Sequence, residues 1–177
     1  MATKSRKPDA IALLKGDHRK VAGLFKKFES ARGPSKKALA REICLELSVH
    51  TMIEETIFYP AVRGPVEKDL MDESHVEHDS AKLLIASILA GKPSDDFYDA
   101  KVTVLKELVK HHVKEEEQRG GLFTQARKSK RLDFVALRER MEALKEELVA
   151  QYTRQGIPTP IVRAVGKPKV KAGKPIA

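Results

Sequence analysis

The sequence has little of what stabilises many small secreted proteins: it contains one cysteine, no tryptophan and only 5% aromatic residues. A single thiol cannot form a disulfide within the chain, which excludes a secreted disulfide scaffold. Cys44 stands among apolar residues, so we expect a buried structural thiol rather than a nucleophile. The scarcity of aromatic residues and of β-branched alternation favours helices over a β-sandwich or a β-barrel.

Long apolar runs are also missing. No stretch approaches the roughly 18 uninterrupted apolar residues of a membrane span, and the N-terminal MATKSRKPDA contains no apolar signal-peptide core. We therefore expect a cytoplasmic protein with no membrane partner. A chain of 177 residues is about one domain long, and a domain of about 150 residues buries about 70% of the surface that its unfolded chain exposes.

The formal net charge of +9 is concentrated near the C-terminus. From Pro158 onward the chain carries no acidic residue and five basic ones, which are Arg163, Lys167, Lys169, Lys171 and Lys174. The rest of the chain is only mildly basic. Because short basic termini are common on soluble proteins, nucleic-acid binding through this tail is the least favoured functional hypothesis.

Apolar periodicity and Gly/Pro punctuation predict five helices. They span residues 9–31, 35–60, 69–90, 94–118 and 133–155, with boundaries good to about two to four residues. Helices of this length joined by short turns pack antiparallel to their neighbours. The first four therefore predict an all-α, up-down four-helix bundle.

The fifth predicted helix carries an apolar stripe at heptad-like spacing, formed by Phe134, Leu137, Met141, Leu144 and Leu148. Either the bundle of the same chain or a second copy in a homodimer must cover this stripe, and the sequence leaves both alternatives open. The predicted organisation is a disordered N-terminus at 1–8, the bundle at 9–127, the C-terminal amphipathic helix at 128–157 and a disordered basic tail at 158–177.

Polar residues occupy core positions in the predicted bundle. His18 takes the place of an apolar residue in the buried stripe of the first helix. On the second helix His50 and Glu54 continue the buried stripe four residues apart, and on the fourth helix His112 and Glu116 do the same. The sequence therefore predicts an imidazole and a carboxylate on the inner face of each of these two helices.

The third helix offers two histidines. The stripe through His78 is small or apolar throughout, whereas the stripe through His75 includes Lys82, so we expect His78 to point inward. The halves then repeat, because His18 precedes His50 by 32 positions and His78 precedes His112 by 34. Two helical hairpins with matched polar residues predict one site with approximate two-fold symmetry.

The predicted inward residues are His18, His50, Glu54, His78, His112 and Glu116. Their burial is costly unless a cation binds them, because a buried carboxylate loses hydration worth several kcal/mol. Imidazoles and carboxylates without a thiolate suit iron or manganese better than structural zinc, and six ligands fit two octahedral ions bridged by carboxylates. We predict two iron ions, with manganese or zinc as alternatives. A histidine taken alone on an apolar face is most often a hydrogen-bonded core residue, so the prediction depends on all six.

Five further residues are candidates for additional ligands or for contacts to the ligands: His75, His111, Glu115, Glu55 and Glu117. His75 lies one helical turn from His78. His111 and Glu115 share a stripe with Lys101, which turns them partly outward. Glu55 and Glu117 each follow a predicted ligand directly, and solvation is the alternative interpretation for both.

Several segments resemble the hemerythrin-like family, specifically its HHE cation-binding domain, across residues 9–127. They are Asp17-His18-Arg19, His50-x-x-x-Glu54-Glu55 with Tyr59-Pro60, Val76-Glu77-His78, and the run from Lys110 to Glu117. The resemblance implies a four-helix bundle with an oxo- or hydroxo-bridged di-iron centre, whose partners are oxygen, peroxide or similar small oxidants. Hemerythrin oxygen carriers have His-x-x-x-His and His-x-x-x-x-Asp, where this chain has His75-x-x-His78 and His112-x-x-x-Glu116, so redox turnover is expected over reversible oxygen carriage.

The expected function is therefore a di-iron protein that binds oxygen or reacts with peroxide. If it is an enzyme, the expected type is a peroxide- or oxygen-reactive oxidoreductase of the catalase or peroxidase kind. The alternative from another class is an iron or oxygen sensor, or an iron-handling protein, that acts through a partner. The sequence indicates no pocket for an organic substrate.

Overall fold

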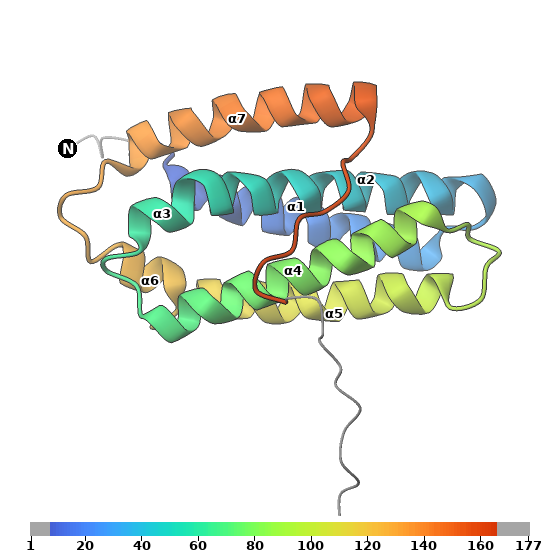
Figure 1. Ribbon diagram of the computed structural model, residues 1–177, viewed down its shortest axis with the longest axis horizontal. Helices are drawn as coiled ribbons and strands as arrows, with labels where there is room; N and C mark the ends of the chain where they lie inside the picture. The colour runs from blue at the N-terminus through green and yellow to red at the C-terminus, as the bar shows by residue number, and fades with distance from the viewer. Residues whose placement is uncertain (1–7, 166–177) are drawn as a thin grey trace, which may run out of the picture.

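The described part of the chain, residues 8–165 of a computed structural model, forms helices and no strand. Four long helices make the bundle, α1 (Ala10–Ser30), α2 (Gly33–Ile53), α4 (Lys68–Ala90) and α5 (Tyr98–Glu117), and α7 (Phe134–Gln155) lies outside it (Figure 1). The short elements are η1 (Glu54–Phe58), α3 (Tyr59–Val62) and α6 (Leu122–Ala126). The all-α prediction is confirmed. Of the ends predicted to be disordered, 1–8 and 158–177, residues 1–7 and 166–177 lie outside the described part of the chain.

Local signals set most helix boundaries where they were predicted. The side chain of Asp9 caps α1 by accepting a hydrogen bond from the backbone N–H of Ala12 at 3.1 Å. Pro34 lies in the first turn of α2, where its missing N–H removes no intrahelical hydrogen bond. Helix α4 ends at Gly91 as expected. None of the helices within residues 8–165 is long and apolar enough to cross a membrane.

The sequence predicted that the second helix ends at Pro60, but in the structure it continues beyond this residue. Helix α2 continues through a π-helical turn, η1, and then through α3 to Val62. In the π turn the backbone N–H of Tyr59 bonds to the carbonyl of Glu54, five residues back, so the turn holds one residue more than an α-helical turn. This wider turn directly precedes Pro60, which cannot donate a backbone hydrogen bond in a regular helix.

The turn after α5 is tight. The N–H of Gly121 bonds to the carbonyl of Gln118 at 3.0 Å. A Cβ at Gly121 would lie 2.2 Å from the carbonyl oxygen of Glu115, a distance that only glycine permits. Gly121 thus allows the chain to fold back against the last turn of α5, directly beside Glu116.

The apolar core consists of two clusters along the bundle. One includes Leu14, Val49, Phe58, Leu122 and Met141, and the other includes Val21, Phe25, Ile43, Ile85 and Leu105. Along the helices, most of the inward-facing polar residues lie between residues of one cluster and residues of the other. On α1, for example, His18 lies between Leu14 of the first cluster and Val21 of the second. The polar layer is therefore closed on both sides by apolar side chains.

Helix α7 and the segment after it both pack against the bundle. Helix α7 lies on α1 and α2 and buries Leu137, Met141, Leu148 and Tyr152, so its apolar stripe is covered by its own chain (Figure 1). The homodimer stays a prediction. Residues 156–165, the C-terminal strap, then cross α2 and α4. The strap is held at Asp79, although its composition had suggested disorder from residue 158 onward.

Candidate metal centre

Four helices bring one histidine each to a common level of the bundle. His18 of α1, His50 of α2, His78 of α4 and His112 of α5 are all buried. Their Nε2 atoms meet in pairs, with 3.2 Å between His18 and His50 and 3.3 Å between His78 and His112. Each helical hairpin, α1–α2 and α4–α5, therefore contributes one pair of facing nitrogens.

Two glutamates lie between these pairs, and neither has any exposed surface. Oε2 of Glu54 lies 3.2 Å from Nε2 of His50 and 3.3 Å from Nε2 of His78. Oε2 of Glu116 lies 3.3 Å from Nε2 of His18 and 3.7 Å from Nε2 of His112. Each carboxylate thus contacts both hairpins, which is the position of a bridging ligand.

A carboxylate lies behind every one of the four imidazoles. His18 donates from Nδ1 to Glu117 at 2.7 Å, and His78 donates to Glu55 at 3.0 Å. His112 donates to Glu77 at 2.8 Å. Nδ1 of His50 lies farther, 3.6 Å, from Oδ2 of Asp17, whose other oxygen, Oδ1, contacts Lys145 of α7. Carboxylates in this position hold the ring in one orientation and direct Nε2 toward the centre.

This arrangement follows the two-fold repeat of the sequence. Asp17 and Glu77 each directly precede the first histidine of their half, and each contacts the second. Glu55 and Glu117 each directly follow the buried glutamate of their half, and each contacts the first histidine of the other half. The sequence had singled out Glu55 and Glu117, but it missed the roles of Asp17 and Glu77.

The geometry of these residues fits a bound cation. When Nδ1 carries the proton of an imidazole, Nε2 carries a lone pair, and two lone pairs facing each other at 3.2 Å repel. Oε1 of Glu54 and Oε2 of Glu116 are buried and receive no hydrogen bond from the described residues. A metal ion satisfies these nitrogens and oxygens together.

The electrostatics of the centre also favour positive charge. Burial lowers the pKa of His50, but Glu54 and Asp17 outweigh burial and raise it to about 10. Burial likewise lowers the pKa of His78, and Glu54 and Glu55 raise it to about 9. Burial raises the pKa of Glu54, yet the neighbouring histidines outweigh burial and hold it well below its usual value. The carboxylates therefore attract either protons or metal ions to the imidazoles.

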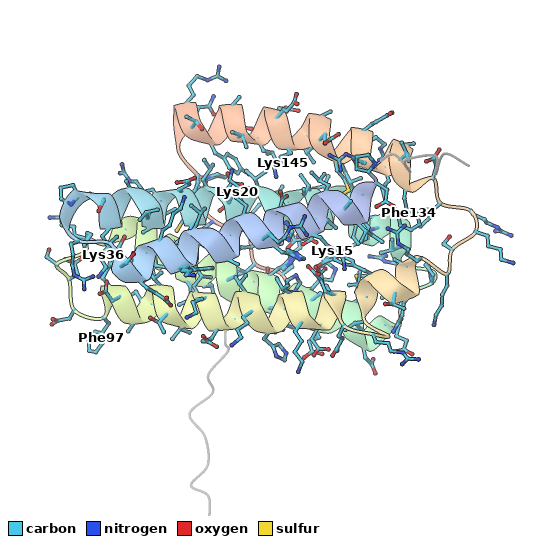
Figure 2. The ribbon with its side chains drawn as sticks, turned by 180° about the vertical axis from the view of Figure 1, so that it is seen from behind. Lys15, Lys20, Lys36, Phe97, Phe134 and Lys145 are labelled. Carbon is cyan, nitrogen blue, oxygen red and sulfur yellow. The ribbon has the colours of Figure 1, made fainter. Side chains whose placement is uncertain are left out.

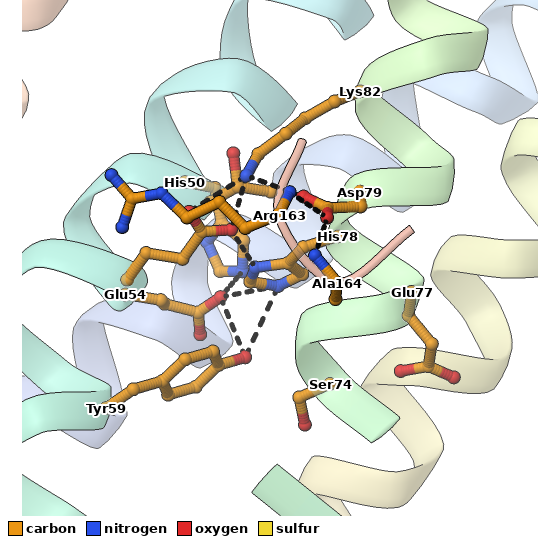
Figure 3. Close-up of polar contacts among 12 residues, drawn as sticks. His50, Glu54, Tyr59, Ser74, Glu77, His78, Asp79, Lys82, Arg163 and Ala164 are labelled. Atoms are coloured by element: carbon orange, nitrogen blue, oxygen red, sulfur yellow. Dashed lines mark hydrogen bonds and ion pairs between the residues drawn. The ribbon is translucent and has the colours of Figure 1, made fainter. Parts of the chain in front are cut away.

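Tyr59 is a residue of the centre that the sequence analysis did not identify. Its hydroxyl donates to Oε1 of Glu116 at 3.2 Å. It also lies 3.3 Å from Nε2 of His78 and 3.5 Å from Oε2 of Glu54 (Figure 3). Burial, together with Glu116 and Glu54, raises the pKa of Tyr59 well above its usual value, so the phenol stays protonated.

The remaining candidates lie outside the centre. His75 is partly exposed and contacts the ring of Tyr59 edge-on, with ring centroids 5.4 Å apart. The same tyrosine ring stacks on His78 of the centre. His111 is half exposed and lies 3.3 Å from Glu77. Glu115 accepts a hydrogen bond from Gln118. The structure brings none of these three residues together with the six buried ones.

A small cavity adjoins the imidazoles. It has a volume of about 20 Å³ and is lined by the four histidines and by apolar residues that include Val21, Leu108, Val109 and Val113. A cavity needs about 10–15 Å³ to hold one water molecule. The space next to the imidazoles therefore accommodates a molecule of one or two heavy atoms.

This fold and donor set define a helical cation-binding bundle. Comparison with known proteins identifies the family to which it belongs. The family model of the hemerythrin HHE cation-binding domain matches residues 9–119. The chain therefore belongs to the hemerythrin HHE cation-binding domain family.

Two known proteins show how far the likeness extends. The crystal structure of a hemerythrin HHE cation-binding domain-containing protein from Mycobacterium kansasii superposes with a TM-score of 0.71 and 25% identity, covering 84% of this chain and 94% of that one. A Nostoc sp. protein described as a DNA nickase is 30% identical over 106 residues, which are 59% of this chain. The match spans only 30% of the length of that Nostoc protein.

Proposed function

We propose that this chain is a cytoplasmic protein that binds two iron ions between its hairpins and uses them to bind oxygen or to react with peroxide. The observation that carries the proposal is that four imidazole nitrogens converge on two fully buried carboxylates. His18 and His50 would hold one ion, and His78 and His112 the other. Glu54 and Glu116 would bridge them.

The donor set supports iron. It combines imidazole nitrogen with carboxylate oxygen, which iron and manganese accept readily, and it includes no thiolate. The single cysteine, Cys44, lies in an apolar cluster, and burial raises the pKa of its thiol to about 12. Manganese and zinc are the alternatives that metal analysis has to distinguish.

The surroundings of the centre suit a small oxidant. Two iron ions, when bound, supply the electrons for binding or reducing oxygen or peroxide. The 20 Å³ cavity admits such molecules and leaves no room for an organic substrate. Tyr59 keeps the proton at its hydroxyl, within 3.2–3.5 Å of Glu116, His78 and Glu54, and can donate a hydrogen bond into the centre.

The test combines metal analysis with turnover. Protein from iron-replete cells is expected to contain about two irons per chain and to show an oxo-bridged diferric absorption band. It should consume hydrogen peroxide, and His50→Ala should lose both the iron and the consumption. Glu115→Ala is the control, because this carboxylate lies outside the centre, where it accepts a hydrogen bond from Gln118, and its loss should leave both unchanged. A folded wild-type protein without a transition metal would contradict the proposal.

A second candidate function, an iron or redox sensor, is favoured by the contacts of the C-terminal strap. One carboxylate oxygen of Asp79 accepts the backbone N–H groups of Arg163, Ala164 and Val165 at 2.6–3.1 Å (Figure 3). Lys82 joins Asp79 to Glu55, and Glu55 contacts His78. A chain of polar contacts thus connects the strap to one imidazole of the centre.

The sensor hypothesis predicts that iron changes the dynamics of the strap. Amide hydrogen exchange at residues 163–165 should slow when iron binds and should become insensitive to iron in Lys82→Met, which breaks the chain of contacts. Iron loading without peroxide turnover, together with this change in exchange, would favour the sensor. Turnover with exchange that is indifferent to iron would favour the oxidant-reactive protein.

A further inference from the structure

The seam between α1 and α5 is covered neither by α7 nor by the strap. Helix α7 lies over α1 and α2, and the strap crosses α2 and α4 (Figure 1). Turned by 180°, the molecule shows α1 and α5 side by side at its front (Figure 2). A groove of about 330 Å³ lies along this seam.

The inner end of the groove reaches the metal centre. His18, Val109 and Val113 line the groove, and the same three residues line the 20 Å³ cavity beside the imidazoles. They therefore form the wall between solvent and the cavity. The two valines are only partly buried, so each is exposed to solvent on the groove side of this wall.

The outer end of the groove is positively charged. Its lining includes Lys26, Lys106 and Lys110 but only one acid, Glu29, which pairs with Lys106 at 2.7 Å. Glu107 lies beside the rim, 3.6 Å from Lys106 and 3.8 Å from Lys110. The three lysines still outnumber the two glutamates, and no acidic partner of Lys26 is among the ion pairs of the described residues. An excess of one sign of charge at the mouth of a cleft concentrates small ions of the opposite sign.

We propose that small inorganic anions reach the metal centre through this groove, with Val109 and Val113 as the size-limiting gate and the lysines as the element that selects for negative charge. The inference rests on the proposed function. It adds the route to the cavity, the two residues that gate this route and the charge at its entrance. The lysine rim accelerates the arrival of anions and leaves that of neutral molecules unchanged.

The gate is tested with two probes on the iron-loaded protein: azide for the diferric form and nitric oxide, a neutral molecule, for the diferrous form. Val109→Phe and Val113→Phe should each slow association of both probes at least tenfold, and Val113→Ala should accelerate it. Iron content and the final azide spectrum show whether each variant keeps its centre. Unchanged association rates in a Phe variant with a normal centre would overturn the route.

The charge selection is tested by Lys26→Glu with Lys110→Glu. This pair should slow azide several-fold at low salt, lose that effect at high salt and leave nitric oxide unaffected. Lys130→Glu with Arg140→Glu is the matched control, because it changes the net charge equally at exposed sites away from the groove. Equal effects of the two pairs on azide would overturn the selection for anions.

A readout without iron separates this inference from the proposed function. Crystals of metal-free protein soaked in bromide should show anomalous density in the groove of the wild type and not of the lysine variant. A wild-type protein that takes up no iron but binds bromide there would contradict the proposed function alone. Absence of bromide from the groove in the wild type would overturn the anion route whatever the iron content.

Discussion

Replacing Glu77 by glutamine should weaken iron binding although Glu77 is not expected to touch iron. Glu77 accepts the Nδ1 proton of His112 at 2.8 Å and is itself buried. The glutamine keeps the size of the side chain and an acceptor oxygen, but it removes the negative charge that strengthens the imidazole as a donor. Loss of such a partner costs about ten- to a hundredfold in metal affinity, or about 1.4–2.7 kcal/mol.

The symmetry mate of Glu77 provides an internal comparison. Asp17 lies 3.6 Å from Nδ1 of His50, beyond hydrogen-bonding distance, and it is shared with Lys145. Asp17→Asn should therefore weaken iron binding less than Glu77→Gln. The lower end of the range, a factor of ten or below, is expected for this variant.

The assay is competition for iron between each variant and a chelator of known affinity, followed at the diferric absorption band. Circular dichroism of the metal-free variants shows that each remains helical. Iron affinity unchanged in Glu77→Gln would refute the idea that the outer carboxylates tune the imidazoles. A larger loss in Asp17→Asn would refute the link between hydrogen-bond distance and effect.

Three further predictions concern the same region. Tyr59→Phe should keep both irons but lower peroxide turnover, and it should destabilise the metal-free protein by about 1–3 kcal/mol in denaturant titrations, because buried Glu116 loses its hydroxyl donor. Unchanged turnover would exclude a role for the Tyr59 hydrogen bond in the reaction. Since the pKa of His50 rises from 6.5 to about 10 on folding, its contribution to the stability of the metal-free protein is complete below pH 6.5 and is lost as pH rises toward 10. Denaturation midpoints that do not fall over this window would contradict that. Gly121→Ala should destabilise the end of α5 and reduce iron content, since the added Cβ would meet the carbonyl of Glu115 at 2.2 Å; a normal melting temperature would show that the turn can relax.

The helices and the inward residues could be predicted from the sequence because both depend on the helical repeat of buried positions. Buried faces repeat every three to four residues, and His18, His50 and His112 occur in phase with them. The same reasoning missed Tyr59, which lies five positions after Glu54 and would face elsewhere on a regular α-helix. The extra residue of the π turn brings it back to the face of Glu54, and α-helical spacing does not reveal such a turn.

Two other features depend on contacts that are distant in the sequence. Asp17 and Glu77 look like ordinary solvated helix charges. The signals for them are that an acid precedes the first histidine of both halves and that both acids stand in segments that resemble the family. The composition of the strap suggests a flexible segment. In the structure, however, its backbone is held by Asp79, which lies 84 or more positions earlier in the sequence. Local composition carries no record of that contact.

The aromatic rings beside the centre make its two halves chemically unequal. Tyr59 stacks on His78 with ring centroids 5.4 Å apart, and at the equivalent place Phe123 stacks on His18 at 5.9 Å. Tyr59 thus places beside one hairpin a phenolic oxygen that the other hairpin lacks. Two iron ions held there would have different surroundings, and Mössbauer spectra of the iron-loaded protein are expected to resolve them as a pair of distinct doublets.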